Sequence, residues 1–150
     1  MKLAEMLNER KTTKQRIVLI NERLHLAAKI QEGDKAPVEP PEELKTELLE
    51  CYDKLAEAIV LINKANIETL VEGKSLMELI ATRDKHVSIA AVLHKLAEHA
   101  GPERGIFSKN EVRFLPAVDI REVRKEADVH AKRARDMDNI IQAANWNTEL

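Results

Sequence analysis

Glu22 and His25 are the residues whose spacing comes nearest to a known metal site. Di-metal carboxylate bundles use Glu-x-x-His, but they need two such motifs and a glutamate from each of two further helices. This chain offers one motif. Glu126 and His130 are four residues apart, which is a different spacing. The sequence therefore favours solvated charge pairs over a buried metal centre.

Arg10 and Arg83 occupy positions where an apolar repeat calls for a hydrophobic residue. A buried charge is tolerated when it is paired and hydrogen-bonded. Asn63, Asn66 and Asp84 are the candidate partners of these two arginines. One interpretation is a polar layer that fixes the register and number of packed helices. A second is a small ligand or ion site formed by these five residues. A third is that the stripe drifts around the helix and leaves the two arginines exposed.

The remaining candidates for chemistry have structural explanations. His94 and His130 fall on apolar repeat positions, where a histidine is more often hydrogen-bonded packing than a ligand. Cys51 also falls on such a position, which predicts a buried structural thiol. The chain has no Gly-rich phosphate loop, no Gly-x-Ser-x-Gly elbow and no Cys-x-x-Cys. We therefore expect no catalytic residue, no bound metal and no cofactor.

Four segments that must position these residues carry an apolar repeat in steps of three and four. Such a repeat puts one stripe on each helix and requires a partner along its length. The repeat positions are Leu3, Met6, Arg10, Thr13, Ile17, Ile20, Leu24 and Ala27; then Leu44, Leu48, Cys51, Leu55, Ala58, Ile62, Ala65 and Thr69; then Leu76, Leu79, Arg83, Val87, Ala90, His94 and Ala97; and finally Ile120, Val123, Ala127, His130, Ala134, Met137, Ile141 and Ala144.

Helix-breaking and capping residues separate the four segments. The first helix should end before Gly33, and Pro41 with two glutamates should open the second. Gly73 marks a short turn, and Asp119 is placed to cap the last helix. The sequence predicts an all-α fold: an antiparallel four-helix bundle of long coiled-coil-like helices, forming a single domain over residues 1–150.

Residues 101–119 predict an extended excursion between the last two helices. The stretch Glu111–Leu115 alternates polar and apolar residues like a short strand. Phe107 and Phe114 belong to the 101–119 excursion, and Trp146 follows at the end of the fourth helix. Two interpretations stay open for the excursion: a cluster packed on its own bundle, or a contact between subunits. We assign Phe107, Phe114 and Trp146 as candidate interface residues.

Composition limits the possible partners. The chain has 24 Lys and Arg against 26 Asp and Glu, a net charge of -2. That balance argues against nonspecific binding to nucleic acid or to anionic membranes. The longest apolar run is too short for a transmembrane helix, and the N-terminus has no signal-peptide core. We expect a cytoplasmic protein whose partner is a further copy of itself.

Several segments, taken in order, resemble the septicolysin-like family of small bacterial proteins over nearly the whole chain. They are Gln31-Glu32-Gly33-Asp34, Ile62-Asn63-Lys64-Ala65-Asn66, Arg83-Asp84, Phe107-Ser108-Lys109-Asn110-Glu111-Val112-Arg113 and Asn145-Trp146-Asn147-Thr148-Glu149-Leu150. Ile106 departs from the family pattern, which has a basic residue there. The resemblance implies a helical fold and no established biochemical activity, while the family name implies a cytolysin.

These observations favour a non-enzymatic, oligomeric helical protein with a structural or interaction role. Two other classes remain: a septicolysin-like pore-forming cytolysin, and a helical bundle that binds a small molecule or a metal.

Overall fold

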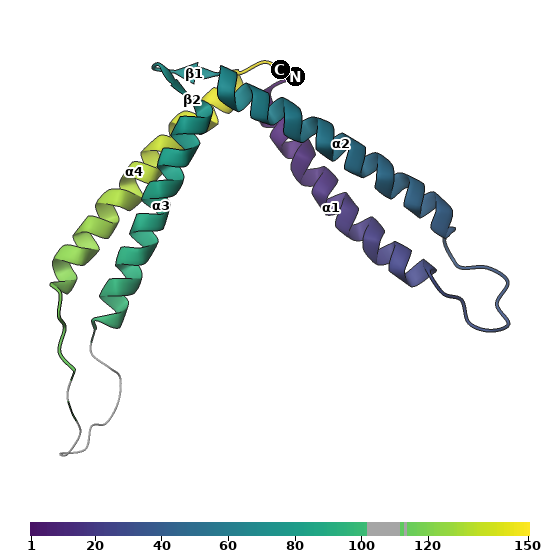
Figure 1. The fold of residues 1–150 in the computed structure, drawn as a ribbon, viewed down its shortest axis with the longest axis horizontal. Helices are drawn as coiled ribbons and strands as arrows, with labels where there is room; N and C mark the ends of the chain where they lie inside the picture. The colour runs from purple at the N-terminus through teal and green to yellow at the C-terminus, as the bar shows by residue number, and fades with distance from the viewer. Residues whose placement is uncertain (102–111, 113) are drawn as a thin grey trace. The chain divides into compact units, whose positions relative to one another are not determined.

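The computed structural model describes residues 1–101, 112 and 114–150. The described chain contains four long helices and a two-stranded antiparallel sheet (Figure 1). The elements are α1 (Leu3–Ala27), α2 (Pro41–Glu68), β1 (Leu70–Val71), β2 (Lys74–Ser75), α3 (Leu76–His99) and α4 (Ile120–Asn147). The predicted all-α fold with four long helices is therefore confirmed.

The chain divides into two compact units. The first unit comprises residues 1–76 and 143–150, and the second comprises residues 77–142. Helix α4 contributes to both. The single domain over residues 1–150 stays a prediction.

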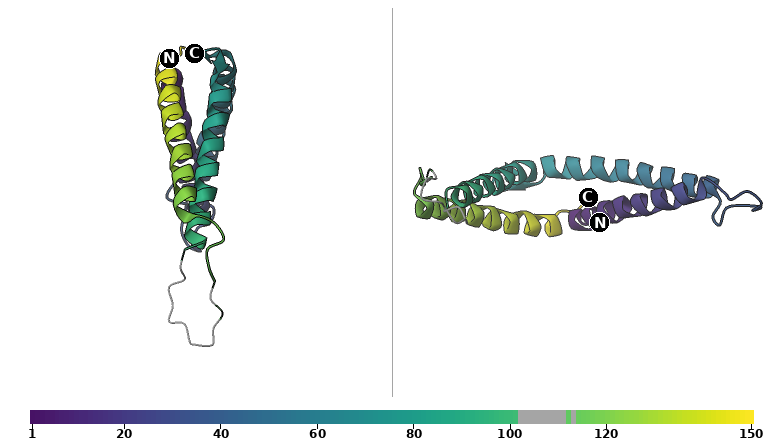
Figure 2. Two further views of the ribbon diagram at one scale, coloured as in Figure 1. Left: turned by 90° about the vertical axis from the view of Figure 1, so that its left-hand side faces the viewer. Right: turned by 90° about the horizontal axis from the view of Figure 1, so that it is seen from below.

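In the first unit, α1 and α2 lie side by side in opposite directions (Figures 1 and 2). Every repeat position predicted for these two helices is buried or half-buried, so both predicted stripes are confirmed. The shared core is built around Ile17, Ile20, Leu44 and Cys51, with Leu24, Leu48 and Leu55 packed against it. Cys51 is a buried free thiol, as the repeat predicted.

A tight hairpin joins α2 to α3. The strands pair Leu70 with Ser75 and Val71 with Lys74, which leaves Glu72 and Gly73 as a two-residue loop. Both loop residues have positive φ angles, 52° and 82°. That conformation suits the right-handed twist of the strands and is tolerated best by glycine at the second position. The predicted short turn at Gly73 is therefore a β-hairpin.

The two ends of the described chain pair with each other in the first unit. The Leu3 amide donates to the Thr148 carbonyl at 2.9 Å, and the Leu150 amide donates to the Met1 carbonyl at 2.9 Å. Lys2 and Glu149 form an ion pair beside these bonds. The hydrogen bond and positive charge of Lys2 lower the pKa of Glu149. This pairing fastens the end of α4 to the start of α1.

In the second unit, α3 and α4 lie side by side (Figures 1 and 2). Side-chain hydrogen bonds join the two helices. Every repeat position predicted for α4 is buried or half-buried. For α3 the prediction was wrong at two positions, because Val87 and His94 are exposed. Their places are taken by His86, which is buried, and Leu93, which is half-buried. A strict alternation of three and four residues runs from Arg83 to His86 and on to Ala90.

The predicted excursion at 101–119 falls mainly on residues outside the described part, including Phe107 and, in the strand predicted at Glu111–Leu115, Glu111 and Arg113. The other three residues of that predicted strand are described and lie in no regular element. Phe114 is described and is 80% exposed. Asp119 caps α4 as predicted, since its carboxylate accepts from the Arg121 and Glu122 amides at 3.0 and 3.1 Å. Within the described ranges, no helix is long and apolar enough to cross a membrane.

Candidate functional site

The five residues predicted to form a polar layer or ligand site are divided between the two units. Arg10, Asn63 and Asn66 belong to the first unit, whereas Arg83 and Asp84 belong to the second. Arg10 and Asn66 are half-buried, and Asn63 is exposed. Within the described residues, no ion pair or hydrogen bond engages the side chain of any of these three. The shared site stays a prediction.

Arg83 is half-buried and bridges α3 and α4. Its Nη1 donates to Asp138 Oδ1 at 2.8 Å, and its Nε donates to Asp84 Oδ1 at 2.9 Å. Burial lowers the pKa of Arg83, but the hydrogen bonds and charges of Asp138 and Asp84 outweigh burial and the net shift is upward. Asp84 was a predicted partner, while Asp138 was not predicted. The guanidinium therefore remains charged and holds the two helices in register.

A pair of histidines lies one helical turn further along α3. Nδ1 of His86 is 2.7 Å from Nδ1 of His130, and the two rings are 5.0 Å apart between centroids. His86 is 8% exposed, and His130 is half-buried. A bond between two ring nitrogens needs one donor and one acceptor, so at least one ring must be neutral.

Burial lowers the pKa of His86, and the positive charges of Lys85, His130 and Arg133 lower it further. No carboxylate contributes to this shift. His86 is therefore held in the neutral form at neutral pH. Two protonated rings at 2.7 Å would lose the hydrogen bond and repel each other.

The described residues do not provide a set of ligands for a metal ion. No group of three or more His, Cys, Asp and Glu side chains is arranged there to hold an ion. Glu22 and His25 are both exposed on α1. The Glu-x-x-His spacing in this chain therefore lies on a solvated helix face.

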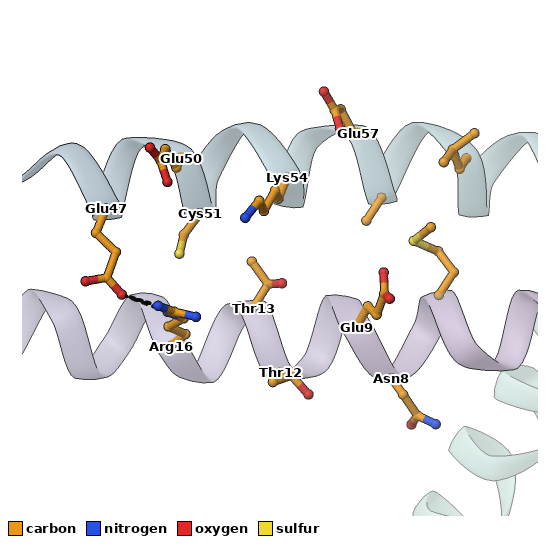
Figure 3. A pocket seen from close by; sticks show the side chains of 13 residues that line it. Asn8, Glu9, Thr12, Thr13, Arg16, Glu47, Glu50, Cys51, Lys54 and Glu57 are labelled. Atoms are coloured by element: carbon orange, nitrogen blue, oxygen red, sulfur yellow. Dashed lines mark hydrogen bonds and ion pairs between the residues drawn. The ribbon is translucent and has the colours of Figure 1, made fainter. Parts of the chain in front are cut away.

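A polar groove runs along one side of the interface between α1 and α2 (Figure 3). It has a cavity volume of about 610 Å³. Thr13 and Cys51 project into the space between the helices (Figure 3). Ala58 adds a short side chain to the lining. These three residues occupy repeat positions, and their small size leaves the interface incompletely filled. The groove therefore follows from the choice of small residues in the two stripes.

Charged side chains line this groove from both helices. Arg16 Nε donates to Glu47 Oε1 at 2.8 Å, joining α1 to α2 across one end. The hydrogen bond of Glu47 raises the pKa of Arg16. The other charged lining residues are Glu9, Glu50, Lys54 and Glu57. None of these four has an ion pair within the part of the chain that is described. Because three of them are carboxylates and one is a lysine, while Arg16 and Glu47 neutralise each other, the groove carries a net negative charge.

Sequence reasoning missed His86, Asp138 and the groove. The sequence contained a signal for the first two. A strict repeat on α3 would have selected His86 in place of Val87. Asp138 directly follows the repeat position Met137, so it could have been recognised as a flanking partner for Arg83. The groove had no such signal, because its charged residues sit beside the stripes and resemble any solvated helix face.

The predicted interface residues that are described lie in the solvent. Phe114 is strongly exposed, and Trp146 on α4 is more than half exposed. Their interface role stays a prediction, as does that of Phe107.

Comparison with known proteins places the chain in a family. A model for a family of unknown function, DUF6847, matches residues 10–150, and the chain belongs to that family. A crystal structure of a functionally unknown conserved protein from Corynebacterium diphtheriae is 36% identical, with a TM-score of 0.93. The alignment covers 100% of this chain and 98% of that one. No curated protein matches the chain significantly.

Proposed function

We propose that this protein is a non-enzymatic, homo-oligomeric interaction protein whose helical hairpins assemble with further copies of the chain. The observation that carries the proposal is a second apolar row on α2. Leu49, Tyr52 and Ile59 follow the repeat positions by one residue, and their side chains are 57%, 51% and 39% exposed. The row therefore lies beside the buried stripe on the same helix.

The thin core of the first unit supports the same proposal. Cys51, Ala58 and Ala65 occupy buried positions where larger side chains would bury more apolar area. Burying a side chain of the size of Leu contributes about 1.5–3 kcal/mol, and burying alanine contributes much less. A partner that covers the second row would add the missing apolar burial. A further copy of the chain is such a partner, and it is present wherever the protein itself is present.

Light scattering on the purified protein at micromolar concentrations tests the proposal. We expect a mass that is a multiple of the chain mass. Ile59→Asp should raise the dissociation constant at least about tenfold, since losing one buried apolar side chain costs about 1.5–3 kcal/mol and 1.4 kcal/mol is tenfold. Gln15→Asp is the matched control, because Gln15 is exposed on α1 and the charge change is the same.

Two results would contradict the proposal. The first is a stable monomer over the whole concentration range. The second is leakage of dye from anionic or neutral lipid vesicles at protein concentrations where assembly is seen, which would favour the septicolysin-like pore-forming alternative. Turnover or metal retained through gel filtration would instead favour a catalytic or metal-binding helical protein.

A further inference from the structure

We propose that the acidic groove between α1 and α2 binds the basic face of α4 from a second copy of the chain. The inference rests on the proposed self-association and names the surfaces that meet in it. Charge, length and the lack of internal ion pairs on both surfaces carry it.

The groove supplies the negative surface. Glu9 lies on α1, and Glu50 and Glu57 lie on α2, and none of them has an ion pair within the described ranges. Lys54 is the one unpaired cation among the residues that line the groove. Leu61, an exposed apolar residue, lines one end. This surface therefore combines an excess of carboxylates with apolar floor and end residues.

Helix α4 supplies the positive surface. Arg121, Arg124, Lys132 and Arg135 are all exposed, and their spacing places them on neighbouring positions of one helix face, interrupted by Asp128. None of the four side chains has an ion pair in the described structure. The other side of the α4 repeat carries Glu122, Glu126 and Asp136. That side also carries Arg133 and Lys125, which pairs with Glu122, so the excess of positive charge on α4 lies on the first face.

The two surfaces also match in length. The α2 wall runs from Glu47 to Leu61, and the basic face of α4 runs from Arg121 to Arg135. Each span is fourteen steps along a helix, or about 21 Å at 1.5 Å per residue. A helix lying lengthwise in a groove is a known recognition geometry that usually depends on apolar anchors, and in this contact opposite charges take their place. Complementary charge then fixes the register of the contact and raises the rate of association.

Charge reversal with mixing of variants tests this inference. The groove variant is Glu50→Lys with Glu57→Lys, and the helix variant is Lys132→Glu with Arg135→Glu. Each variant alone should raise the dissociation constant of the assembly at least tenfold, measured by light scattering and analytical ultracentrifugation. An equimolar mixture should restore association, because the reversed groove then meets the reversed helix and the two native surfaces still meet each other.

Two controls separate this contact from general effects of charge. Asp53→Lys with Glu68→Lys changes the net charge of α2 by the same amount at exposed positions outside the groove, and should leave assembly unchanged. Added salt should weaken the wild-type assembly, since contacts between exposed charges are screened. Restoration by mixing also shows that both variants are folded.

The possible failures can be told apart. A monomeric wild-type protein overturns the proposed function and this inference together. A wild-type oligomer that both reversal variants preserve overturns this inference alone. If mixing fails but one chain carrying all four reversals regains the wild-type behaviour, the groove and helix meet within one chain and the intermolecular contact is wrong.

Discussion

The α1–α2 interface has branched apolar side chains at its centre, whereas the middle of the α3–α4 interface is built from alanine, histidine and arginine. Ile17, Ile20 and Leu44 are buried in the first hairpin. Ala90, Ala127 and Ala134 are buried in the second, with His86 between them along the stripe. Small residues let two helices approach closely, so short polar side chains can reach each other across the interface. The first hairpin therefore depends on apolar volume, and the second on close approach and polar contacts.

Removing apolar volume should have the largest effect, and it should act through the first hairpin. Ile20 and Ile62 are each 1% exposed. Ile20→Ala or Ile62→Ala should lower the free energy of unfolding by about 2–4 kcal/mol, because transfer energy is lost and a cavity remains. Urea denaturation followed by circular dichroism measures the loss.

Val38→Ala is the control for these truncations. Val38 is fully exposed in the loop before α2, so its truncation should change stability by less than about 0.5 kcal/mol. Equal small losses for Ile20→Ala and Val38→Ala would contradict the described packing of α1 on α2.

Adding volume should have the next largest effect, and it should act through the second hairpin. Ala127 is fully buried between α3 and α4. Ala127→Leu should cost about 1–3 kcal/mol, because extra methylene groups force tightly packed helices apart. Ala91→Leu on the exposed face of α3 is the matched control and should be close to neutral. If both substitutions are tolerated equally, the α3–α4 interface is looser than described.

The contrast between the hairpins also explains what could be predicted from the sequence. In α1 and α2, Leu and Ile recur often enough to fix the spacing of the stripe, so the positions between them, such as Thr13 and Cys51, were also predicted correctly. The middle of the α3 stripe, from Arg83 to Ala90, is made of arginine, histidine and alanine, whose burial is not signalled by residue type. Val87 and His94 were therefore chosen over His86 and Leu93, although the strict spacing favoured the latter pair.

The candidate sites were predictable to a smaller extent than the fold. Arg83 was recognised because a charge on a repeat position is unusual, and Asp84 was recognised because it is adjacent. Asp138 and His86 come from distant parts of the sequence, and their positions depend on the register between α3 and α4. A repeat places residues on a face of one helix, but it does not fix which residue of the partner helix lies opposite. The His86–His130 bond therefore needed the structure.

Breaking the arginine contact should have a moderate effect. Arg83→Ala should cost roughly 1–2 kcal/mol, because charge-assisted hydrogen bonds are lost but both carboxylates stay partly solvated. Arg83→Met should cost less, since its side chain retains the packing of the arginine stem. A double-mutant cycle with Asp138→Asn should give a coupling energy of about 0.5–1 kcal/mol. Zero coupling would show that the bond between α3 and α4 contributes nothing in solution.

The smallest expected effect is a pH dependence specific to the second hairpin. Because burial lowers the pKa of His86, the folded protein binds a proton there less readily than the unfolded chain, whose histidines titrate near pH 6.5. The contribution of neutral His86 to the free energy of unfolding is therefore fully present above about pH 6.5. It is lost progressively as the pH falls below that value. Urea midpoints measured between about pH 5 and pH 8 should fall toward the acidic end in the wild-type protein. The ion-paired carboxylates Glu39 and Glu149, whose pKa values are lowered, titrate below this window.

The variant His86→Leu tests whether the histidine pair causes this change of the urea midpoint with pH. The substitution removes the titrating group from the α3–α4 interface and should flatten the dependence between about pH 5 and pH 7. His25→Leu serves as the control, because His25 is exposed on α1 and has no role in the second hairpin. That variant should keep the wild-type slope. If the slope survives in His86→Leu and disappears in His25→Leu, the pH response belongs to the first hairpin, and the contrast between apolar and polar interfaces would not extend to proton binding.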